Sequence, residues 1–366
     1  MNSISSASSN APSVLLIYTG GTIGMIANPE TGVLEAFDFE YIEQHVPEIQ
    51  RFGYHIDTIS FKSAIDSSDM GPACWVDIVR IIEKHYEQYD GFVVLHGTDT
   101  MAYTASALSF MLEHLSKPVV LTGSQLPIGM LRTDGKENLI ASLEIAAARD
   151  EQGLPYVSEV CVLFNDLLLR GNRTTKTCAD QFAAFASPNL PALAEVGIDI
   201  HYDRALLRPA AGTPLKCHTV LNEHVVVLKL FPGISASTVR GILNTEGLKG
   251  VVLETYGSGN APTSDWFINE IRQAVQRGIV IVNVTQCTRG TVVMHRYDTG
   301  NRLLCAGVVS GYDSTTEAAV TKLMFLLGQG IPTEEVKRLL QTDLAGELTL
   351  EHNLPSPYVL SSRCLK

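Results

Sequence analysis

One local pattern recurs along the 366 residues of this chain: a short β-branched apolar run, then glycine and hydroxyl residues, then a helical pattern. The apolar runs show no alternation with polar residues, as expected of strands that are buried on both faces of a sheet. Seven such runs occur, at residues 14–18, 92–95, 119–121, 160–164, 225–228, 251–253 and 279–283. Because the strands alternate with helices, the sequence predicts an α/β fold with a largely parallel sheet.

Two stretches between the runs carry apolar residues at helical spacing. The first covers residues 75–89, with one apolar face formed by Trp75, Ile78, Val79, Ile82 and Tyr86. The second covers residues 265–277, with Phe267, Ile268, Ile271 and Val275 on one face. Gly278 follows the second stretch and provides a C-terminal stop.

The chain is longer than a single hydrophobic core usually supports, so we expect two domains. Residues 204–223 break the strand–helix rhythm with prolines and polar residues, and we interpret them as the interdomain linker. A larger N-terminal domain with a doubly wound, mostly parallel sheet covers residues 13–203, and a smaller parallel α/β domain covers residues 224–366. Residues 1–12 have neither a basic nor an apolar region, so a disordered tail is expected rather than a signal peptide.

The composition excludes several classes of partner. The 27 basic and 39 acidic residues give a formal net charge of −12, which argues against nucleic acid and anionic membranes. No apolar run is long enough to span a bilayer. The seven cysteines include no C-x-x-C motif, so reduced thiols in a cytoplasmic protein are expected. The ten histidines form no metal-binding motif, and no metal site is predicted.

Chemistry is expected just after the strands, because ligands of open parallel sheets bind beyond the carboxyl ends of the strands. After the first run, Thr19-Gly-Gly-Thr-Ile-Gly24 combines a flexible glycine pair with hydroxyls. It does not match G-x-G-x-x-G, so a dinucleotide site is not indicated. A glycine turn whose threonines only bond the backbone explains the segment structurally, whereas the functional interpretation makes Thr22 an exposed nucleophile.

Two further strand ends carry polar groups that could assist a nucleophile. The segment His96-Gly-Thr-Asp-Thr100 follows the second run, and Arg170-Gly-Asn-Arg-Thr-Thr-Lys176 follows the fourth. Helix capping by Thr98 or Asp99 and a solvated basic loop are the structural alternatives.

A weak hydroxyl nucleophile needs a base or a relay, which Thr98, Asp99 and Lys176 could supply. A nearby Asp99 favours charged Lys176, so polarisation of Thr98 by Lys176 stays open beside a role as base. We set His96 aside, because a packed core histidine explains it equally well.

The segments Thr19-Gly-Gly-Thr-Ile-Gly24 and His96-Gly-Thr-Asp-Thr-Met101 closely resemble the two signature segments of the bacterial-type asparaginase/glutaminase family, which are far more specific together than apart. The resemblance continues through residues 66–70 (DSSDM), 121–125 (LTGSQ), 256–262 (YGSGNAP) and 285–287 (TQC), and covers roughly residues 14–349. Residues 101–105 (MAYTA) and 170–176 (RGNRTTK) are similar to the cytoplasmic, type I branch.

The resemblance implies an L-asparaginase that hydrolyses L-asparagine to L-aspartate and ammonia through a threonine acyl-enzyme intermediate. It implies Thr22 as the nucleophile and Thr98, Asp99 and Lys176 as the relay. The substrate-binding residues that it implies are Asp66, Ser67, Ser68, Thr98, Asp99 and, from the partner subunit, Asn260. It further implies no cofactor or metal, and a homotetramer of two intimate dimers with the active sites at the dimer interfaces.

Two positions depart from the family pattern. Many relatives have a tyrosine in the loop after the first motif, where this chain has Val33. Any catalytic role of a tyrosine hydroxyl must then be absent or be supplied by another residue. Tyr297 is the candidate for this catalytic role, and the alternative interpretation of Tyr297 is a half-buried tyrosine that serves only packing. An arginine of a separate effector site is replaced by Glu254, which cannot hold a carboxylate in the same way. We therefore expect this regulation to be altered or lost, although Thr175 and Cys287 match other positions of that site.

Three alternatives stay open. A glutaminase or mixed amidohydrolase differs from an asparaginase by one substrate methylene, worth only about 1–3 kcal/mol in selectivity. A tRNA-dependent amidotransferase subunit borrows this fold, but an additional N-terminal domain is then expected. A non-catalytic asparagine or aspartate sensor predicts loss of a relay residue, yet Thr22, Thr98, Asp99 and Lys176 are all present.

Overall fold

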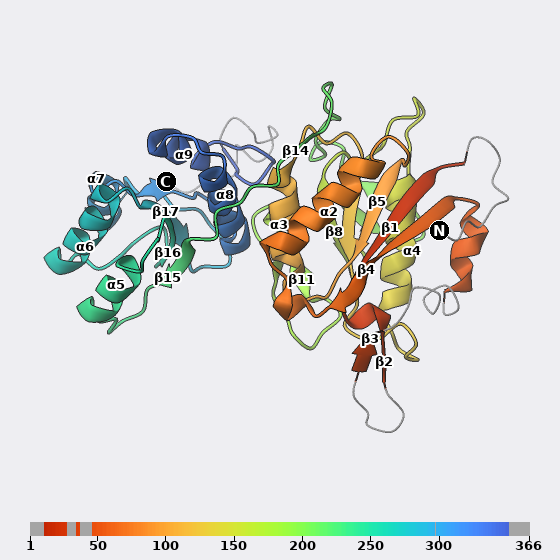
Figure 1. The fold of residues 1–366 in the computed structure, drawn as a ribbon, viewed down its shortest axis with the longest axis horizontal. Helices are drawn as coiled ribbons and strands as arrows, with labels where there is room; N and C mark the ends of the chain where they lie inside the picture. The colour runs from red at the N-terminus through yellow and green to blue at the C-terminus, as the bar shows by residue number, and fades with distance from the viewer. Residues whose placement is uncertain (1–10, 28–33, 37–45, 297, 351–366) are drawn as a thin grey trace. The chain divides into compact units, whose positions relative to one another are not determined.

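The computed structural model describes residues 11–27, 34–36, 46–296 and 298–350. Most of the predicted tail (residues 1–12), Val33 and Tyr297 lie outside these ranges. The chain divides into two compact units, Met1–Thr219 and Val220–Lys366. Figure 1 shows the helices and strands of both units.

An eight-stranded sheet forms the centre of the N-terminal unit, in the order β13-β12-β9-β8-β7-β5-β1-β4. The pairs from β4 to β8 are parallel, whereas β9, β12 and β13 are added in antiparallel fashion. The strands are β1 (Ser13–Gly20), β4 (His55–Ile65), β5 (Gly91–Leu95), β7 (Val119–Thr122), β8 (Val160–Phe164), β9 (Leu167–Arg170), β12 (Ala194–Val196) and β13 (Ile200–Tyr202). All four apolar runs predicted in this half of the chain are therefore strands.

Helices and short elements connect these strands. The helices are α2 (Pro72–His85), α3 (Met101–Met111) and α4 (Gly135–Ala147), with 3-10 turns η1 (Thr22–Gly24), η2 (Pro47–Phe52), η3 (Ser67–Asp69) and η4 (Gly171–Arg173). Three small pairs consist of β2 (Met25–Ala27) with β3 (Leu34–Ala36), β6 (Leu112–Glu113) with β14 (Lys216–Cys217), and β10 (Thr175–Lys176) with β11 (Phe185–Ala186). The helix predicted over residues 75–89 begins earlier, at Pro72, where the missing N–H of proline costs no helical bond.

Helices cover both faces of this sheet. Val93 of β5 belongs to a core that includes Leu139 and Leu143 of α4. The next residue along the strand points to the opposite face. There the ring of Phe92 stacks on Tyr86, which directly follows α2, with ring centroids 6.0 Å apart. Strands β1, β5, β7 and β8 are buried on both sides, as their lack of polar alternation predicts.

The C-terminal unit contains a four-stranded parallel sheet in the order β15-β16-β17-β18. The strands are β15 (Val225–Lys229), β16 (Gly250–Thr255), β17 (Val280–Thr285) and β18 (Val309–Ser310). The helices are α5 (Ala236–Leu243), α6 (Asp265–Gln276), α7 (Asp298–Cys305), α8 (Thr316–Gly328) and α9 (Thr333–Leu340). The three apolar runs and the helix predicted at residues 265–277 are confirmed, and Gly278 has the left-handed φ of 89° expected of a helix stop. The observed fold thus has the two predicted α/β units, of which the N-terminal one has the larger sheet.

The segment predicted as a linker, residues 204–223, is partly tied to the N-terminal unit. Its strand β14 pairs with β6, with Lys216 opposite Glu113. His218 Nε2 also lies 2.8 Å from Glu113 Oε2. The division between the two units falls inside this segment, after Thr219.

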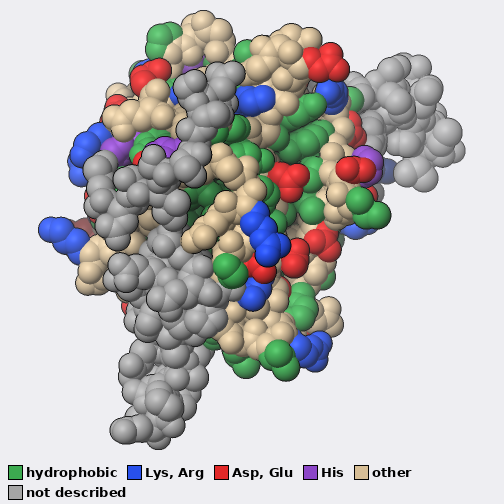
Figure 2. Space-filling view, turned by 90° about the vertical axis from the view of Figure 1, so that its right-hand side faces the viewer, with side chains coloured by type: hydrophobic (Ala, Val, Ile, Leu, Met, Phe, Trp, Pro, Cys, Tyr) green, Lys and Arg blue, Asp and Glu red, His purple; other side chains and the backbone are tan. Residues whose placement is uncertain are grey.

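Two observations concern membrane-spanning helices and surface charge. Within the described ranges, no helix is both long and apolar enough to cross a bilayer. On the face drawn in Figure 2, lysine and arginine side chains are interspersed with aspartate and glutamate rather than gathered into one basic area. That face does not offer the basic patch that nucleic acid requires.

Candidate active site

Four strand ends of the N-terminal unit lie in close contact with one another. Gly21 has a φ of 89°, and a Cβ added to it would lie only 2.4 Å from Gly97 Cα. A Cβ on Gly97 would meet Ser67 Oγ at 2.6 Å, and one on Gly123 would meet the His96 carbonyl oxygen at 2.3 Å. A side chain does not fit at any of these positions, so glycine is required there. The polar residues that follow β1, β4, β5 and β7 therefore share one region of the structure.

Thr22 stands at the start of this region, as the first residue of η1. The turn is anchored on both sides: Gly24 N donates to the Gly21 carbonyl oxygen at 3.2 Å, and the carbonyl oxygen of buried Ile23 accepts from Ile128 N at 3.2 Å. Thr22 itself is only half-buried. A rigid turn thus presents a partly exposed hydroxyl, which a nucleophile requires.

Lys176 joins Thr98 and Asp99 directly. Its Nζ donates to Thr98 Oγ1 and to Asp99 Oδ1, each at 2.8 Å. Thr98 is buried, whereas the Asp99 side chain is 66% exposed and the Lys176 side chain 18%. The structure therefore brings together the three residues that the sequence placed in one relay, with the carboxylate facing solvent.

The basic segment before Lys176 is packed rather than solvated. Arg170 and Arg173 are buried, and the Arg170 guanidinium forms an ion pair with buried Glu159. Arg170 Nη2 also donates to the Leu206 carbonyl oxygen at 2.7 Å. A buried charge requires such partners, because its desolvation is costly. The solvated-loop alternative is wrong, and the packed arginines fix the direction in which the chain enters β10.

The predicted carboxylate-binding residues follow β4: Asp66 is the N-cap residue of η3, and Ser67 and Ser68 lie within it. Asp66 Oδ1 accepts from Ser68 N at 2.9 Å and from Ser68 Oγ at 2.8 Å. These hydrogen bonds, chiefly the one from the backbone, hold the pKa of Asp66 below its usual value. Ser67 Oγ accepts from Asp99 N at 3.3 Å, and the Ser67 carbonyl oxygen accepts from Thr100 Oγ1 at 2.6 Å. The serine turn is thus tied to the segment that carries Thr98 and Asp99.

His96 is a core residue with both ring nitrogens engaged. Its Nδ1 lies 2.7 Å from the Gly97 carbonyl oxygen, and its Nε2 lies 2.9 Å from Thr104 Oγ1. The Trp75 indole N–H donates to Thr104 Oγ1 at 3.0 Å. A carbonyl only accepts, so Nδ1 carries the proton and Thr104 donates to Nε2. Burial lowers the pKa of His96 to about 4, and a general base with no free nitrogen is not expected to reach a substrate.

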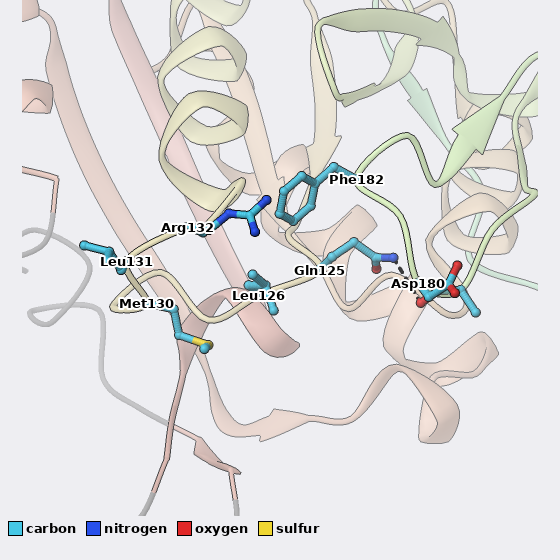
Figure 3. Close-up of a pocket in the computed structure, with 8 residues that line it drawn as sticks. Gln125, Leu126, Met130, Leu131, Arg132, Asp180 and Phe182 are labelled. Atoms are coloured by element: carbon cyan, nitrogen blue, oxygen red, sulfur yellow. Dashed lines mark hydrogen bonds between the residues drawn. The ribbon is translucent and has the colours of Figure 1, made fainter.

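Gln125 belongs to the same cluster, although the sequence did not single it out as a site residue. Its Oε1 accepts from Thr98 Oγ1 at 3.2 Å. Its Nε2 donates to the carbonyl oxygens of Ala179, at 3.2 Å, and Gln181, at 3.0 Å. Figure 3 shows the side chain directed toward this segment, at the edge of a groove of about 600 Å³. The available signal was its place three residues beyond a buried strand, where ligands of parallel sheets bind.

Asn260 and Glu254, the other named residues, belong to the C-terminal unit. Asn260 lies in the turn after β16, where its Oδ1 accepts from Thr299 Oγ1 at 2.6 Å. Glu254 lies within β16 and is buried. Its carboxylate lies 3.2 Å from Lys229 Nζ and accepts from Thr316 Oγ1 at 2.7 Å. The catalytic candidate Tyr297 lies outside the described residues.

No metal or disulfide chemistry is apparent in the described part of the chain. Its His, Cys, Asp and Glu side chains form no group of three that could hold a metal ion. The six cysteines within the same ranges are free thiols. The chemistry available at the cluster is that of hydroxyl, carboxylate and ammonium groups.

Comparison with known proteins matches both units. The model "Asparaginase, N-terminal" matches residues 13–208, and the model "Glutaminase/Asparaginase C-terminal domain" matches residues 224–340. L-asparaginase 1 of Escherichia coli strain K12 is 47% identical over 342 residues, which cover 92% of this chain and 98% of that protein. The 60 kDa lysophospholipase of Mus musculus is 48% identical over 362 residues, covering 92% of this chain but 62% of that protein.

A solved structure agrees with these sequence matches. The crystal structure of L-asparaginase I from Vibrio cholerae superimposes with a TM-score of 0.84 at 42% identity, covering 93% of this chain and all of that one. Sequence, domain order and fold give the same result over nearly the whole length. The chain belongs to the asparaginase/glutaminase family.

Proposed function

We propose that this protein is an L-asparaginase, an amidohydrolase that converts L-asparagine to L-aspartate and ammonia. The observation that carries the proposal is the hydrogen-bonded cluster of Lys176, Thr98 and Asp99 beside the glycine turn of Thr22. Thr22 and Thr98 each follow one of two glycines whose backbones touch, Gly21 and Gly97. Relatives at 47% identity over almost their full length carry the name L-asparaginase.

The proposed reaction proceeds in two steps through Thr22. In the first, Thr22 Oγ1 attacks the side-chain amide carbon, the C–N bond breaks, and the hydroxyl proton is passed to the leaving nitrogen, which departs as ammonia. The product is an ester between the threonine and the aspartyl group. In the second step, water adds to this ester, the C–O bond to Thr22 breaks, and aspartate leaves with the hydroxyl restored.

The remaining site residues have complementary roles in this proposal. Thr98 serves in the relay by accepting a hydrogen bond from the Thr22 hydroxyl or from water, and the positive charge of Lys176 stabilises the negative charge that develops. The exposed carboxylate of Asp99 binds the α-ammonium group of the substrate. Ser67 and Ser68, positioned by Asp66, bind its α-carboxylate. Tyr297 stays a candidate for the phenolic role that Val33 cannot fill.

The proposal extends to assembly and location. The site is completed by Asn260 from a second copy of the chain, in an intimate dimer, and two dimers form a homotetramer in the cytoplasm. A mixing experiment tests the shared site, because Thr22→Ala and Asn260→Ala damage it from different subunits. Each variant alone is expected to be impaired, and their mixed dimer to regain one intact site of two. Mixed subunits that stay as inactive as the parents count against a shared site.

Ammonia release by the purified protein tests the activity. With L-asparagine, the wild-type protein and Thr22→Ser, which retains a hydroxyl, are expected to turn over, and Thr22→Ala is expected to lose at least about 10³-fold in kcat. A parallel series with L-glutamine decides between an asparaginase and a mixed amidohydrolase. Unchanged ammonia release by Thr22→Ala overturns the assignment of Thr22 as the nucleophile. Binding of asparagine without turnover by the wild-type protein identifies the sensor alternative instead.

The name of the mouse relative calls for one further assay. This chain spans only 62% of that lysophospholipase, so ester cleavage of a lysophospholipid needs its own measurement. The same preparation is incubated with lysophosphatidylcholine, and released fatty acid is quantified. Fatty acid release without ammonia release from asparagine contradicts the proposed function.

A further inference from the structure

We propose that Gln125 is a positioning residue that acts on catalysis through Thr98 and Lys176, an inference that rests on the proposed function. Its side-chain amide lies between the Thr98 hydroxyl and the segment that follows Lys176. Figure 3 shows the amide directed toward the part of that segment near Asp180. It directs the proton of the Thr98 hydroxyl away from the reacting groups. It also holds the chain that carries Lys176 in place.

The orientation of the Gln125 amide is determined by its partners. The NH₂ group has two hydrogens to donate, and the carbonyl oxygens of Ala179 and Gln181 accept them at 3.2 and 3.0 Å. The reversed amide would place its oxygen against two oxygens that can only accept, leaving polar groups unpaired. Gln125 Oε1 must therefore face Thr98.

This orientation fixes the direction of the Thr98 hydroxyl. A threonine hydroxyl has one hydrogen and two lone pairs. Lys176 Nζ can only donate and takes one lone pair, and Gln125 Oε1 can only accept and takes the hydrogen. One lone pair is left, and it can accept a hydrogen bond from the Thr22 hydroxyl or from water. Without Gln125 the hydroxyl can rotate and present its hydrogen instead.

The backbone of Gln125 is itself held firmly. Gln125 N donates to both carboxylate oxygens of Asp134, at 3.0 and 2.9 Å, and Leu126 N donates to Asp134 Oδ1 at 3.2 Å. Asp134 directly precedes α4. Within α4, Asn138 Nδ2 donates to the Gly123 carbonyl oxygen at 3.0 Å. A side-chain amide that must orient another group needs a backbone held in place in this way.

The two carbonyl oxygens that Gln125 binds belong to a compact turn between β10 and β11. Thr177 N donates to the Ala184 carbonyl oxygen at 2.8 Å, which closes the turn, and Lys176 pairs with Phe185. Gln125 thus connects the end of β7 to the residues directly after Lys176. Loss of this connection is expected to loosen the ammonium group relative to Thr98.

The variant Gln125→Met tests the proposal, because methionine has a similar length and no amide. We expect kcat for asparagine to fall at least about tenfold with KM within about twofold, since Gln125 has no assigned contact with substrate. The matched control is Gln329→Met. Gln329 Nε2 also donates to two backbone carbonyls, those of Val220 and Phe325, in the C-terminal unit. This control is expected to keep wild-type kcat.

A double-mutant cycle separates action through Thr98 from general damage. If Gln125 acts through the Thr98 hydroxyl, Gln125→Met lowers kcat by a smaller factor in a Thr98→Val background than in wild type. If kcat of the double variant falls by the product of the two single-variant factors, the proposal is overturned. A kcat for Gln125→Met within twofold of wild type overturns it as well.

Hydrogen exchange of the backbone amides provides a readout that does not depend on turnover. Residues 177–184 are expected to exchange faster in Gln125→Met than in wild type and in Gln329→Met. Unchanged exchange overturns the tethering role. If the wild-type protein releases no ammonia from asparagine but exchange in this turn rises, the proposed function fails while the tether by Gln125 stands.

Discussion

The Lys176 ammonium group and the Asp99 carboxylate form an ion pair at 2.8 Å whose two ends differ in environment. The lysine side chain is 18% exposed and the aspartate side chain 66%. Exposed pairs of this kind contribute only about 0–1 kcal/mol to the free energy of unfolding. Stability alone therefore gives little reason for this pair, and we expect its loss to appear in catalysis.

Replacing Lys176 by methionine tests this expectation. Lys176→Met is expected to lower kcat by about 10²–10³-fold, because a positive charge beside Thr98 no longer stabilises the transition state. Its melting temperature is expected to stay close to that of wild type. Lys216→Met, which removes a lysine 3.0 Å from Glu113 in the same unit, serves as the control and should keep full activity. Equal kcat values for the two variants contradict the assigned role.

The contact between Gly21 and Gly97 leads to a prediction about folding. Gly21→Ala combines a left-handed φ of 89° with a Cβ 2.4 Å from Gly97 Cα. We expect it to lower the free energy of unfolding by about 3 kcal/mol or more, from backbone strain and overpacking together. Gly153→Ala has a similar φ of 78° and open space around the new methyl group, so it should lose only about 1 kcal/mol. Urea titrations of both variants provide the measurement, and equal losses would refute the crowding argument.

The buried His96 predicts a pH dependence of stability. Its pKa is about 4 in the folded protein and about 6.5 when unfolded, so the unfolded state binds the proton more readily between these values. Its contribution to stability is thus fully present above pH 6.5 and declines as the pH falls toward 4. We expect a loss of about 2 kcal/mol in unfolding free energy between pH 7 and pH 5 from this residue.

Two variants isolate the contribution of His96 in denaturant titrations at both pH values. His96→Gln, although less stable overall, is expected to lose about 2 kcal/mol less than wild type between pH 7 and pH 5. His201→Gln, at an exposed position in the same unit, should keep the full wild-type dependence. An equal pH dependence in wild type and His96→Gln would show that the histidine is not held neutral.

The partners of Glu254 predict simple saturation kinetics. Its carboxylate is buried and engaged by Lys229 and Thr316, where the effector site of some relatives presents an arginine. A ligand carboxylate would meet like charge there, so asparagine is not expected to bind as an effector. Initial rates against asparagine concentration should follow a hyperbola with a Hill coefficient of about 1. A clearly sigmoidal curve argues against this prediction.

Much of the fold was predictable from the order of residues. Six of the seven apolar runs lie in strands that are buried on both sheet faces, which removes polar residues from them, whereas β15 carries the same signature although Val227 is exposed. Strand β4 was missed, since its residues are largely half-exposed and show no apolar run. The antiparallel strands β12 and β13 were missed because three residues are too few to show a period.

The sequence by itself determined which groups are available: a threonine after a glycine pair, a Thr-Asp pair after the second strand, and a lysine after an arginine-rich segment. Local order also determined where they stand, because the residue after a buried strand lies at the sheet edge where ligands bind. Whether Arg170 was packed or solvated, and whether His96 was free or held in the core, depended on contacts with Glu159 and Thr104 that form only when strands and helices pack.

Only the tertiary structure decided how these groups meet. Lys176 contacts Thr98 and Asp99 across more than seventy residues, and Gln125 bonds Thr98 on one side and the turn after Lys176 on the other. Hydrogen bonds depend on distance and direction, which strand order and the touching glycines set. Composition and spacing carry neither quantity. The sequence thus supplies the chemistry, and the packing of strand ends aligns it.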